Sequence, residues 1–333
     1  MMKKPFKTDV AVFINFFNRP IVLQKVFEAV KEGRPSKLFL SCDGARVGRE
    51  DDIVNIKECQ KIVENIDWEC EVHKNYSEKN LGCGMRMYTG ITWVLQHVES
   101  VIILEDDCVP SQSFLPFCKE LLDKYKDDQR IYMISGMNHL GIYEKPTSDY
   151  FFGPGCCCGW ATWRRAWEAI DFSMSFLENK YEMQCVTHLY PYYRNAIAIG
   201  EERLKKLSRG EKLTAWTYQS GMAAALNNQI SILPTKNLIT NIGLTNDSTH
   251  GTNNLRKLPK RTQAYFFIPT YEYEFPLKHP QYVIEDRMYY EIKEKKFKTN
   301  IFTRLEGIIR RVIFADKGEV KGMIARKLKR KRK

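Results

Sequence analysis

No apolar run in this 333-residue sequence approaches the roughly 20 residues that a transmembrane helix needs. The N-terminal segment is basic but lacks the apolar region of a secretory signal, because Asn15 interrupts the apolar stretch of residues 10–17. With 44% hydrophobic and 28% charged residues, the composition is that of a globular protein with a substantial core. We therefore expect a cytoplasmic protein, with peripheral attachment to the inner face of the cytoplasmic membrane left open.

The ten cysteines lack the paired spacing of a zinc site. They are dispersed along the chain, and the neighbouring Cys156, Cys157 and Cys158 cannot easily close one tetrahedral site. Without a secretory signal, thiols are expected to stay reduced. We interpret the cysteines as small packing residues, with redox or metal roles as the alternative.

The net charge of +12 is unevenly distributed. Residues 317–333 hold nine Lys or Arg against Glu319 alone, and residues 301–314 repeat apolar residues at helical spacing with arginines between them. A basic amphipathic helix followed by a polybasic tail is typical of attachment to anionic lipid, and a solvated tail is the alternative. Nucleic-acid binding is disfavoured because the basic residues are terminal and do not alternate with aromatic ones.

Strand-like and helix-like segments alternate over the first 140 residues, which predicts an α/β fold: a Rossmann-like, mostly parallel sheet flanked by helices. Strands are expected at residues 10–16, 38–42, 69–73, 101–104 and 131–135, and helices at 20–31, 51–66, 85–97 and 113–125. Beyond residue 150 we expect a loop at 151–160, helices at 163–170, 183–189, 195–207 and 216–227, a strand at 230–233, and no regular elements from 250 to 280.

The most informative pattern lies at residues 100–108, where four apolar residues run directly into Glu105, Asp106 and Asp107. An apolar run of this kind is typical of a strand buried on both faces. In open α/β sheets, ligands bind beyond the carboxyl ends of the strands. Three adjacent carboxylates there favour a hard divalent cation bridged to phosphates, whereas a solvated acidic turn is the alternative.

Three weaker signals accompany the acidic cluster. Arg19 follows the first expected strand, where its guanidinium could bind a pyrophosphate. Asp43 ends the second strand and could accept a hydrogen bond from a base or ribose, although an ordinary Asp-Gly turn explains it equally well. The segment from Asn80 to Arg86 is a glycine loop opening a helix, which lets backbone N–H groups approach phosphate. It matches neither a P-loop nor the G-x-G-x-x-G fingerprint.

Taken together and in this order, these segments resemble the GT-A-fold glycosyltransferases. The likeness is to the branch containing N-acetylglucosaminyltransferase I and its bacterial family-2-like relatives, and it covers roughly residues 8 to 250. Glu105-Asp106-Asp107 corresponds to the DXD-like motif. The other matching segments are Phe16-Phe17-Asn18-Arg19, Ser41-Cys42-Asp43, the Phe-Phe-Gly-Pro-Gly to Gly-Trp loop at 151–160, Trp216-Thr217-Tyr218-Gln219 and Asn241-Ile242-Gly243-Leu244.

The resemblance implies roles for these positions. Asp107 would be the principal ligand of Mn²⁺ or Mg²⁺, with Asp106 beside it and His250 completing the site; a plain loop histidine is the alternative. The remaining donor contacts would come from Glu105 and Asp106 to ribose and sugar, Arg19 and the Arg86 loop to the diphosphate, Asp43 to the base, and the loop ending in Gly159 and Trp160 to the donor sugar.

The departure from the family concerns the catalytic base. Relatives place an aspartate directly after the tryptophan of this segment, whereas this chain has Thr217, whose hydroxyl cannot act as a base near neutral pH. Asp247 and Glu211 are the candidate substitutes.

The resemblance therefore predicts a metal-dependent hexosyl- or N-acetylhexosaminyltransferase. It would use a nucleotide sugar, with UDP as the expected nucleotide, and a glycan or lipid-linked acceptor in surface polysaccharide or lipooligosaccharide synthesis. Residues 1–250 would form the catalytic domain and residues 251–333 an irregular extension. One alternative is a non-catalytic GT-A domain that binds nucleotide or glycan. A second is a sugar-phosphate nucleotidyltransferase, which the lack of a basic glycine-rich loop after the first strand disfavours.

Overall fold

A mixed eight-stranded sheet forms the centre of the protein in the computed structural model, which describes residues 3–211, 216–244 and 255–314. Its strands lie in the order β3-β2-β1-β4-β8-β6-β9-β7. Their bounds are β1 Thr8–Phe16, β2 Pro35–Cys42, β3 Glu71–Tyr76, β4 Ser100–Glu105, β6 Ile131–Ser135, β7 Tyr150–Gly153, β8 Trp160–Trp163 and β9 Ile230–Pro234. All but β7 and β8 run in the same direction, which confirms the predicted α/β fold with a mostly parallel sheet.

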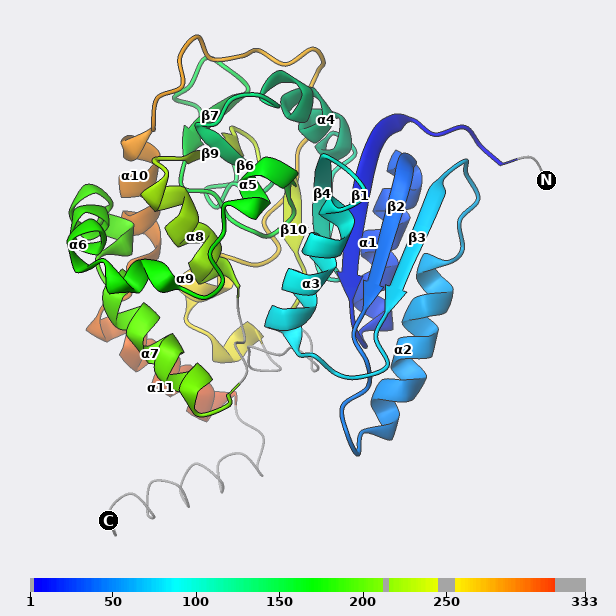
Figure 1. Ribbon diagram of the computed structural model, residues 1–333, viewed down its shortest axis with the longest axis horizontal. Helices are drawn as coiled ribbons and strands as arrows, with labels where there is room; N and C mark the ends of the chain where they lie inside the picture. The colour runs from blue at the N-terminus through cyan, green and yellow to red at the C-terminus, as the bar shows by residue number, and fades with distance from the viewer. Residues whose placement is uncertain (1–2, 212–215, 245–254, 315–333) are drawn as a thin grey trace.

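Helices cover both faces of this sheet (Figure 1). On one face, α1 (Pro20–Gly33), α2 (Glu50–Val63) and α4 (Phe114–Lys124) form one core together with alternate residues of β1, such as Val12 and Ile14. On the other face, α3 (Cys83–Leu95) packs on Phe13, together with a tryptophan cluster from later in the chain. Each buried strand therefore contributes apolar side chains to two cores, which explains its nearly continuous apolar sequence.

The prediction of a loop over residues 151–160 is wrong at both ends. Residues 151–153 belong to β7, and Trp160 is the first residue of β8. Each strand has four residues, and β8 is inserted antiparallel between β4 and β6. Its register pairs Trp160 with Ile103, far away in the sequence. Strands this short, paired this distantly, leave little periodicity for a sequence pattern to reveal.

The second half of the chain adds mainly helices: α5 (Arg164–Glu168), α6 (Lys180–Leu189), α7 (Ala196–Ser208) and α8 (Thr217–Leu226). After the described chain resumes at residue 255, it contains the 3₁₀ turn η3 (Leu255–Lys257), the short α9 (Lys260–Gln263), α10 (Arg287–Phe297) and α11 (Ile301–Ile313). Short helical elements thus occur where none was expected, and α11 forms the predicted amphipathic helix. Within the described residues, none of the helices combines the length and apolar content of a membrane span.

The cysteines of the described chain are all free thiols. Four of them, Cys42, Cys59, Cys108 and Cys118, are buried, as packing residues should be. Cys83 and Cys185 are exposed, so the packing interpretation is wrong for these two.

A buried aspartate ties the start of α2 to the loops after β1 and β2. Asp52 is fully buried and accepts hydrogen bonds from Asn18 Nδ2 (2.6 Å) and from Arg46 Nε and Nη2 (both 2.7 Å). The hydrogen bonds from Arg46 lower the pKa of Asp52 to about 2. Because the bonded form is the carboxylate, this network is intact at neutral pH.

Asp52→Asn should therefore remove an acid-sensitive part of the stability. A carboxyl whose folded pKa lies below its unfolded pKa stabilises the protein above the unfolded value, and this contribution is lost as the pH falls through the folded value. Between about pH 4 and pH 2, we expect wild type to lose about 2 kcal/mol more unfolding free energy than the variant, measured by urea titration. Asp51→Asn, which removes an exposed partner of Arg49, is the control. An equal acid dependence in both variants would contradict this assignment.

Candidate functional site

A cavity of about 440 Å³ opens beyond the carboxyl ends of β1, β2 and β4. The parallel register sets these ends side by side, since Asn15 of β1 pairs with both Ser41 of β2 and Glu105 of β4. Six residues predicted from the sequence line the cavity together: Arg19, Asp43, Arg86, Glu105, Asp106 and Asp107. This is the place where ligands bind in open α/β sheets.

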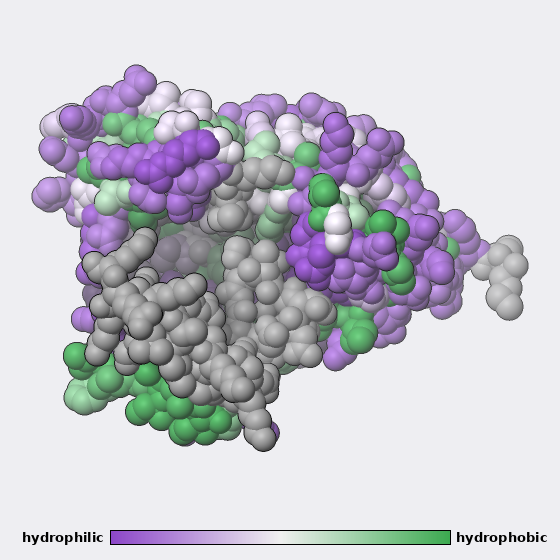
Figure 2. All heavy atoms as spheres, turned by 90° about the horizontal axis from the view of Figure 1, so that it is seen from below, coloured by the Kyte–Doolittle hydropathy of each residue, from purple (hydrophilic) through white to green (hydrophobic). Residues whose placement is uncertain are grey.

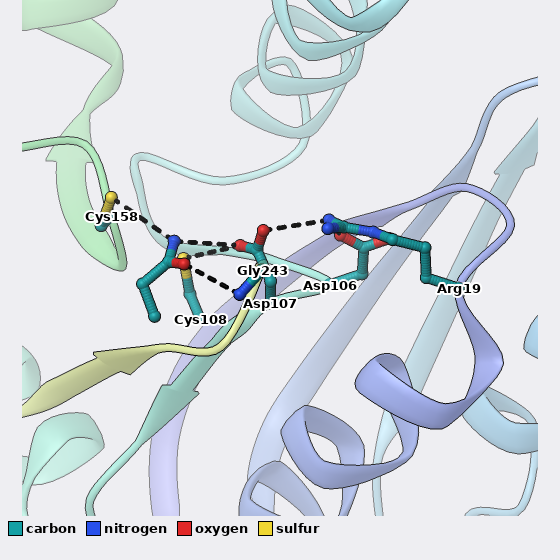
Figure 3. Close-up of polar contacts among 7 residues, drawn as sticks. Arg19, Asp106, Asp107, Cys108, Cys158 and Gly243 are labelled. Carbon is teal, nitrogen blue, oxygen red and sulfur yellow. Dashed lines mark hydrogen bonds and ion pairs between the residues drawn. The ribbon is translucent and has the colours of Figure 1, made fainter. Parts of the chain in front are cut away.

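Arg19 forms ion pairs with the acidic cluster (Figure 3). It is the residue before α1, whose first position is Pro20, so the end of β1 and the helix start together direct its side chain across the end of β4. Its Nε donates to Asp106 Oδ2 at 3.2 Å, and its Nη2 donates to Asp106 Oδ1 and, at 3.0 Å, to Asp107 Oδ2. The sequence placed Arg19 opposite a diphosphate and did not reveal this pairing.

The acidic cluster carries more negative charge than Arg19 neutralises. Burial and the neighbouring Asp107 and Asp106 raise the pKa of Glu105 to about 8. Burial also raises the pKa of Asp106, against the opposing effect of Arg19. Asp106 and Asp107 share one guanidinium, with Glu105 beside them, so a further cation would relieve the repulsion that opposes charging all three carboxyl groups.

The residues present fit a hard divalent cation in part. Within residues 3–211, 216–244 and 255–314, no three His, Cys, Asp or Glu side chains converge closely enough to form a complete protein cage. Mg²⁺, however, is usually held by one or two carboxylates together with substrate phosphates and water. Asp106 and Asp107, next to a cavity with room for a diphosphate, match that donor set.

Two residues that no sequence pattern assigned a role lie against Asp107. The strand β10 (Ile239–Asn241) pairs antiparallel with β5 (Cys108–Pro110), which places Asn241 opposite Cys108. Asn241 Nδ2 lies 3.4 Å from Asp107 Oδ1, and Asn241 Oδ1 accepts from Gly243 N at 2.9 Å. The cluster is therefore built from both halves of the chain (Figure 3). The Asn-Ile-Gly-Leu segment was recognisable by resemblance, but its contact with Asp107 depends on this pairing.

Gly243→Ala should weaken ligand binding at Asp107 without unfolding the protein. A Cβ at Gly243 would overlap the Asp107 carboxylate, so the carboxylate must shift from the position in which it accepts from Arg19. We expect at least a tenfold loss of Mn²⁺-dependent UDP affinity, about the size of a disrupted outer-shell contact, measured by calorimetry. Gly153→Ala in β7 is the control, because a Cβ there would make only ordinary van der Waals contacts, the nearest 3.5 Å away at Leu233, and Gly153 does not line the cavity. Unchanged affinity in Gly243→Ala would show that the carboxylate position is unimportant.

Asp43 organises the glycine loop that closes one side of the cavity. Its Oδ1 accepts from the backbone N–H groups of Leu81 (2.8 Å) and Gly44 (3.0 Å), and its Oδ2 accepts from that of Gly82 (2.9 Å). Gly82 has a φ of +82°, a conformation that favours glycine. The amides of this loop thus point at the Asp43 carboxylate, which leaves fewer of them for a phosphate than the sequence suggested.

Arg86 lies almost completely buried in the first turn of α3 and lines the same cavity. Its Nη2 donates to the backbone oxygen of Asn75 and, at 3.1 Å, to Asn75 Oδ1. Its Nε has no hydrogen-bond partner within the described part of the chain. Burial lowers the pKa of Arg86 from its ordinary value. An unused buried donor of this kind suits an anionic ligand.

Several sequence-predicted site residues are not brought to the cavity wall. Trp160 is buried and stacks on Trp216, with ring centroids 5.2 Å apart. Gly159 packs its backbone against Ile239. Glu211 is exposed, and its Oε1 lies 3.9 Å from Arg209 Nη1. Thr217 is exposed at the start of α8. Asp247 and His250 lie outside the described residues.

Comparisons with known proteins give structural likenesses at low sequence identity. No protein-family model matches the chain, and a search of curated proteins finds no match. Among solved structures, UDP-glucose pyrophosphorylase in complex with UDP-glucose is similar at 12% identity, over 48% of this chain and 78% of that one, with a TM-score of 0.27. HddC from Yersinia pseudotuberculosis is similar at 12% identity, over 52% and 86% of the two chains, with a TM-score of 0.30. Likenesses this distant carry no functional argument.

Proposed function

We propose that this protein is a metal-dependent glycosyltransferase that moves a sugar from a nucleotide donor, with UDP as the nucleotide, to a glycan or lipid-linked acceptor. One observation carries the proposal: residues assigned by resemblance to the donor and metal site line a single cavity beyond the carboxyl ends of the parallel strands. The volume of about 440 Å³ lies within the range of small-molecule sites.

Each side of the cavity has a role in this proposal. Asp107 and Asp106 would hold Mn²⁺ or Mg²⁺, which supplies Lewis-acid stabilisation of the departing diphosphate. Arg19 and the buried Arg86 would bind phosphate oxygens through charge-assisted hydrogen bonds. Arg19 would then exchange part of its pairing with the carboxylates for the diphosphate. This exchange is favoured because the bound metal ion would remain beside the carboxylates and neutralise them in place of Arg19.

The direct test is a donor screen on the intact chain. Common nucleotide sugars are incubated with Mn²⁺ and candidate glycan acceptors, and UDP release is measured. We expect acceptor-dependent UDP release and, in parallel, a rise in melting temperature with UDP only when Mn²⁺ is present. Metal-independent UDP binding would place the nucleotide elsewhere. Pyrophosphate release from UTP and a sugar phosphate would instead support a nucleotidyltransferase.

Thr217 favours a second candidate, a domain of this fold that binds a nucleotide or glycan without transfer. Within the described residues, the acidic side chains lining the cavity are Asp43, Glu105, Asp106 and Asp107. Asp43 accepts from its glycine loop, Asp106 and Asp107 pair with Arg19, and the resemblance assigns Glu105 to the donor. No described carboxylate is thus left over there to deprotonate an acceptor. Donor binding without turnover across the acceptor panel would support this candidate.

Thr217→Asp should raise the rate of transfer if this position corresponds to the base of related enzymes. A positioned general base contributes about a hundredfold or more, so we expect at least about a tenfold gain in kcat even with imperfect placement. The change is tolerable for folding, because Thr217 is exposed and an acid suits the first turn of a helix. Thr217→Asn is the control, because asparagine has the shape of aspartate without its charge. No gain over that control would show that position 217 does not face the acceptor.

A further inference from the structure

The helix α11 leaves a continuous apolar face exposed. Ile301, Phe302, Leu305, Ile308, Ile309, Val312 and Ile313 each remain 49% to 75% exposed. Their spacing follows the helical period, so they gather along one side of the helix. Figure 2, which views the molecule from below, shows this hydrophobic patch at the edge of the molecule where α11 lies. Apolar patches of this kind mark interaction sites.

The opposite face of α11 is attached to the wall of the functional cavity. Thr303 and Gly307 are buried, and a Cβ at Gly307 would lie 3.2 Å from Pro259. Glu306 Oε1 accepts from Lys260 N at 3.1 Å, and Arg310 Nη1 donates to the backbone oxygen of Arg256 at 3.3 Å. The helix is therefore fixed to η3 and α9. Its apolar face is exposed on a helix that packs against the protein, not on a detached terminal segment.

The segment of residues 255–266, which contains η3 and α9, also lines the functional cavity. It contributes Leu258, Thr262 and Phe266 to the cavity wall. Figure 1 places α11 on the lower side of the molecule, where the strands β1, β2 and β3 also have their carboxyl ends. A surface that bound the apolar face of α11 would consequently lie on the side of the molecule toward which these strand ends point.

The charge around the apolar face indicates what binds it. Arg304 and Arg311 are exposed on α11, and in the sequence beyond the described residues positions 317–333 include nine Lys or Arg. Two copies of the chain meeting through this face would bring their basic groups together, which is unfavourable. An anionic lipid surface instead neutralises them, with each basic residue near it contributing on the order of 1 kcal/mol.

We propose that α11 is a membrane-docking helix, which lies in the interface of an anionic bilayer with its apolar face in the acyl region. The attachment of α11 to the cavity wall would hold the mouth of the cavity near the lipid surface. This inference does not depend on the reaction catalysed, because it rests on the exposed face and its charge. It also fits an acceptor that is itself held in the bilayer.

Vesicle co-sedimentation of the full chain tests the proposal. Wild type should bind vesicles rich in phosphatidylglycerol and should bind pure phosphatidylcholine vesicles at least about tenfold more weakly. Ile308→Asp combined with Ile309→Asp should lower the partition coefficient on anionic vesicles by about tenfold or more, since two side chains lose their burial. Ile53→Asp combined with Val54→Asp is the matched control, because these two side chains are exposed to a similar extent, at 49% and 68%, on the distant helix α2.

The charge component has its own variant. Arg304→Gln combined with Arg311→Gln should weaken binding about tenfold and reduce its dependence on salt. The proposal is wrong if wild type does not bind anionic vesicles, or if the double aspartate variant binds as wild type does. It is equally wrong if sedimentation velocity shows a wild-type dimer that the double aspartate variant dissociates, because a second copy would then cover this face. Melting curves verify that each variant is folded.

Discussion

Replacing Asp107 with alanine is expected to abolish Mn²⁺-dependent UDP binding and to lower kcat/KM by more than about a hundredfold. Loss of an outer-shell partner of a metal costs about ten- to a hundredfold in affinity or activity, and a direct ligand should cost more. Asp107 is the carboxylate on which Arg19, Asn241 and Gly243 converge, so no neighbour can take its position. The measurements are UDP calorimetry with and without Mn²⁺ and the UDP-release rate.

Two comparisons make this prediction specific. Asp123→Ala removes an exposed carboxylate that pairs with Lys119 on α4, and it should leave both measurements unchanged. Asp107→Asn keeps the shape and the hydrogen bond with Arg19 but loses the charge. If the carboxylate acts as a cation ligand, asparagine should be nearly as damaging as alanine. Activity retained in Asp107→Asn would indicate a structural role in orienting Arg19.

The parts of this fold that were predictable from sequence are those whose signal is local. Residues 10–16 and 101–104 are nearly continuous apolar runs because each contributes to two cores, and Pro20 marks the beginning of α1. These features place the carboxyl ends of β1 and β4 at one sheet edge once parallel pairing is assumed. The position of Arg19 at the same sheet edge as the acidic cluster follows from that arrangement, although the ion pairs between them do not.

The parts that were not predictable depend on distant pairing or on competition between partners. The strands β5 and β10 have three residues each, and nothing local in Asn241 indicates that it lies beside Asp107. Asp43 has the same sequence context whether it binds a ligand or the amides of its own glycine loop. Periodicity does not decide such choices, because they depend on the three-dimensional distance between donors and acceptors.

Arg19→Met should destabilise the ligand-free protein while making it more responsive to a divalent cation. Arg19 is the cation that faces Asp106 and Asp107, and the three side chains are only 7% to 17% exposed. Removal of one partner from a buried ion pair typically costs about 3–5 kcal/mol, because the remaining charge has no counterion. We therefore expect a marked fall in the unfolding free energy without metal, measured by urea denaturation, toward the lower end of that range.

Manganese should restore much of this loss, because the carboxylates that Arg19 occupied become available to the ion. The rise in melting temperature on addition of Mn²⁺ alone should be larger in Arg19→Met than in wild type. UDP affinity in the presence of Mn²⁺ should nevertheless fall, since the diphosphate loses its guanidinium partner. Arg130→Met, which breaks an exposed pair with Asp128, should show neither effect. If Mn²⁺ stabilises the variant no more than wild type, Arg19 and the cation do not share these carboxylates, and the acidic cluster serves only to position the arginine.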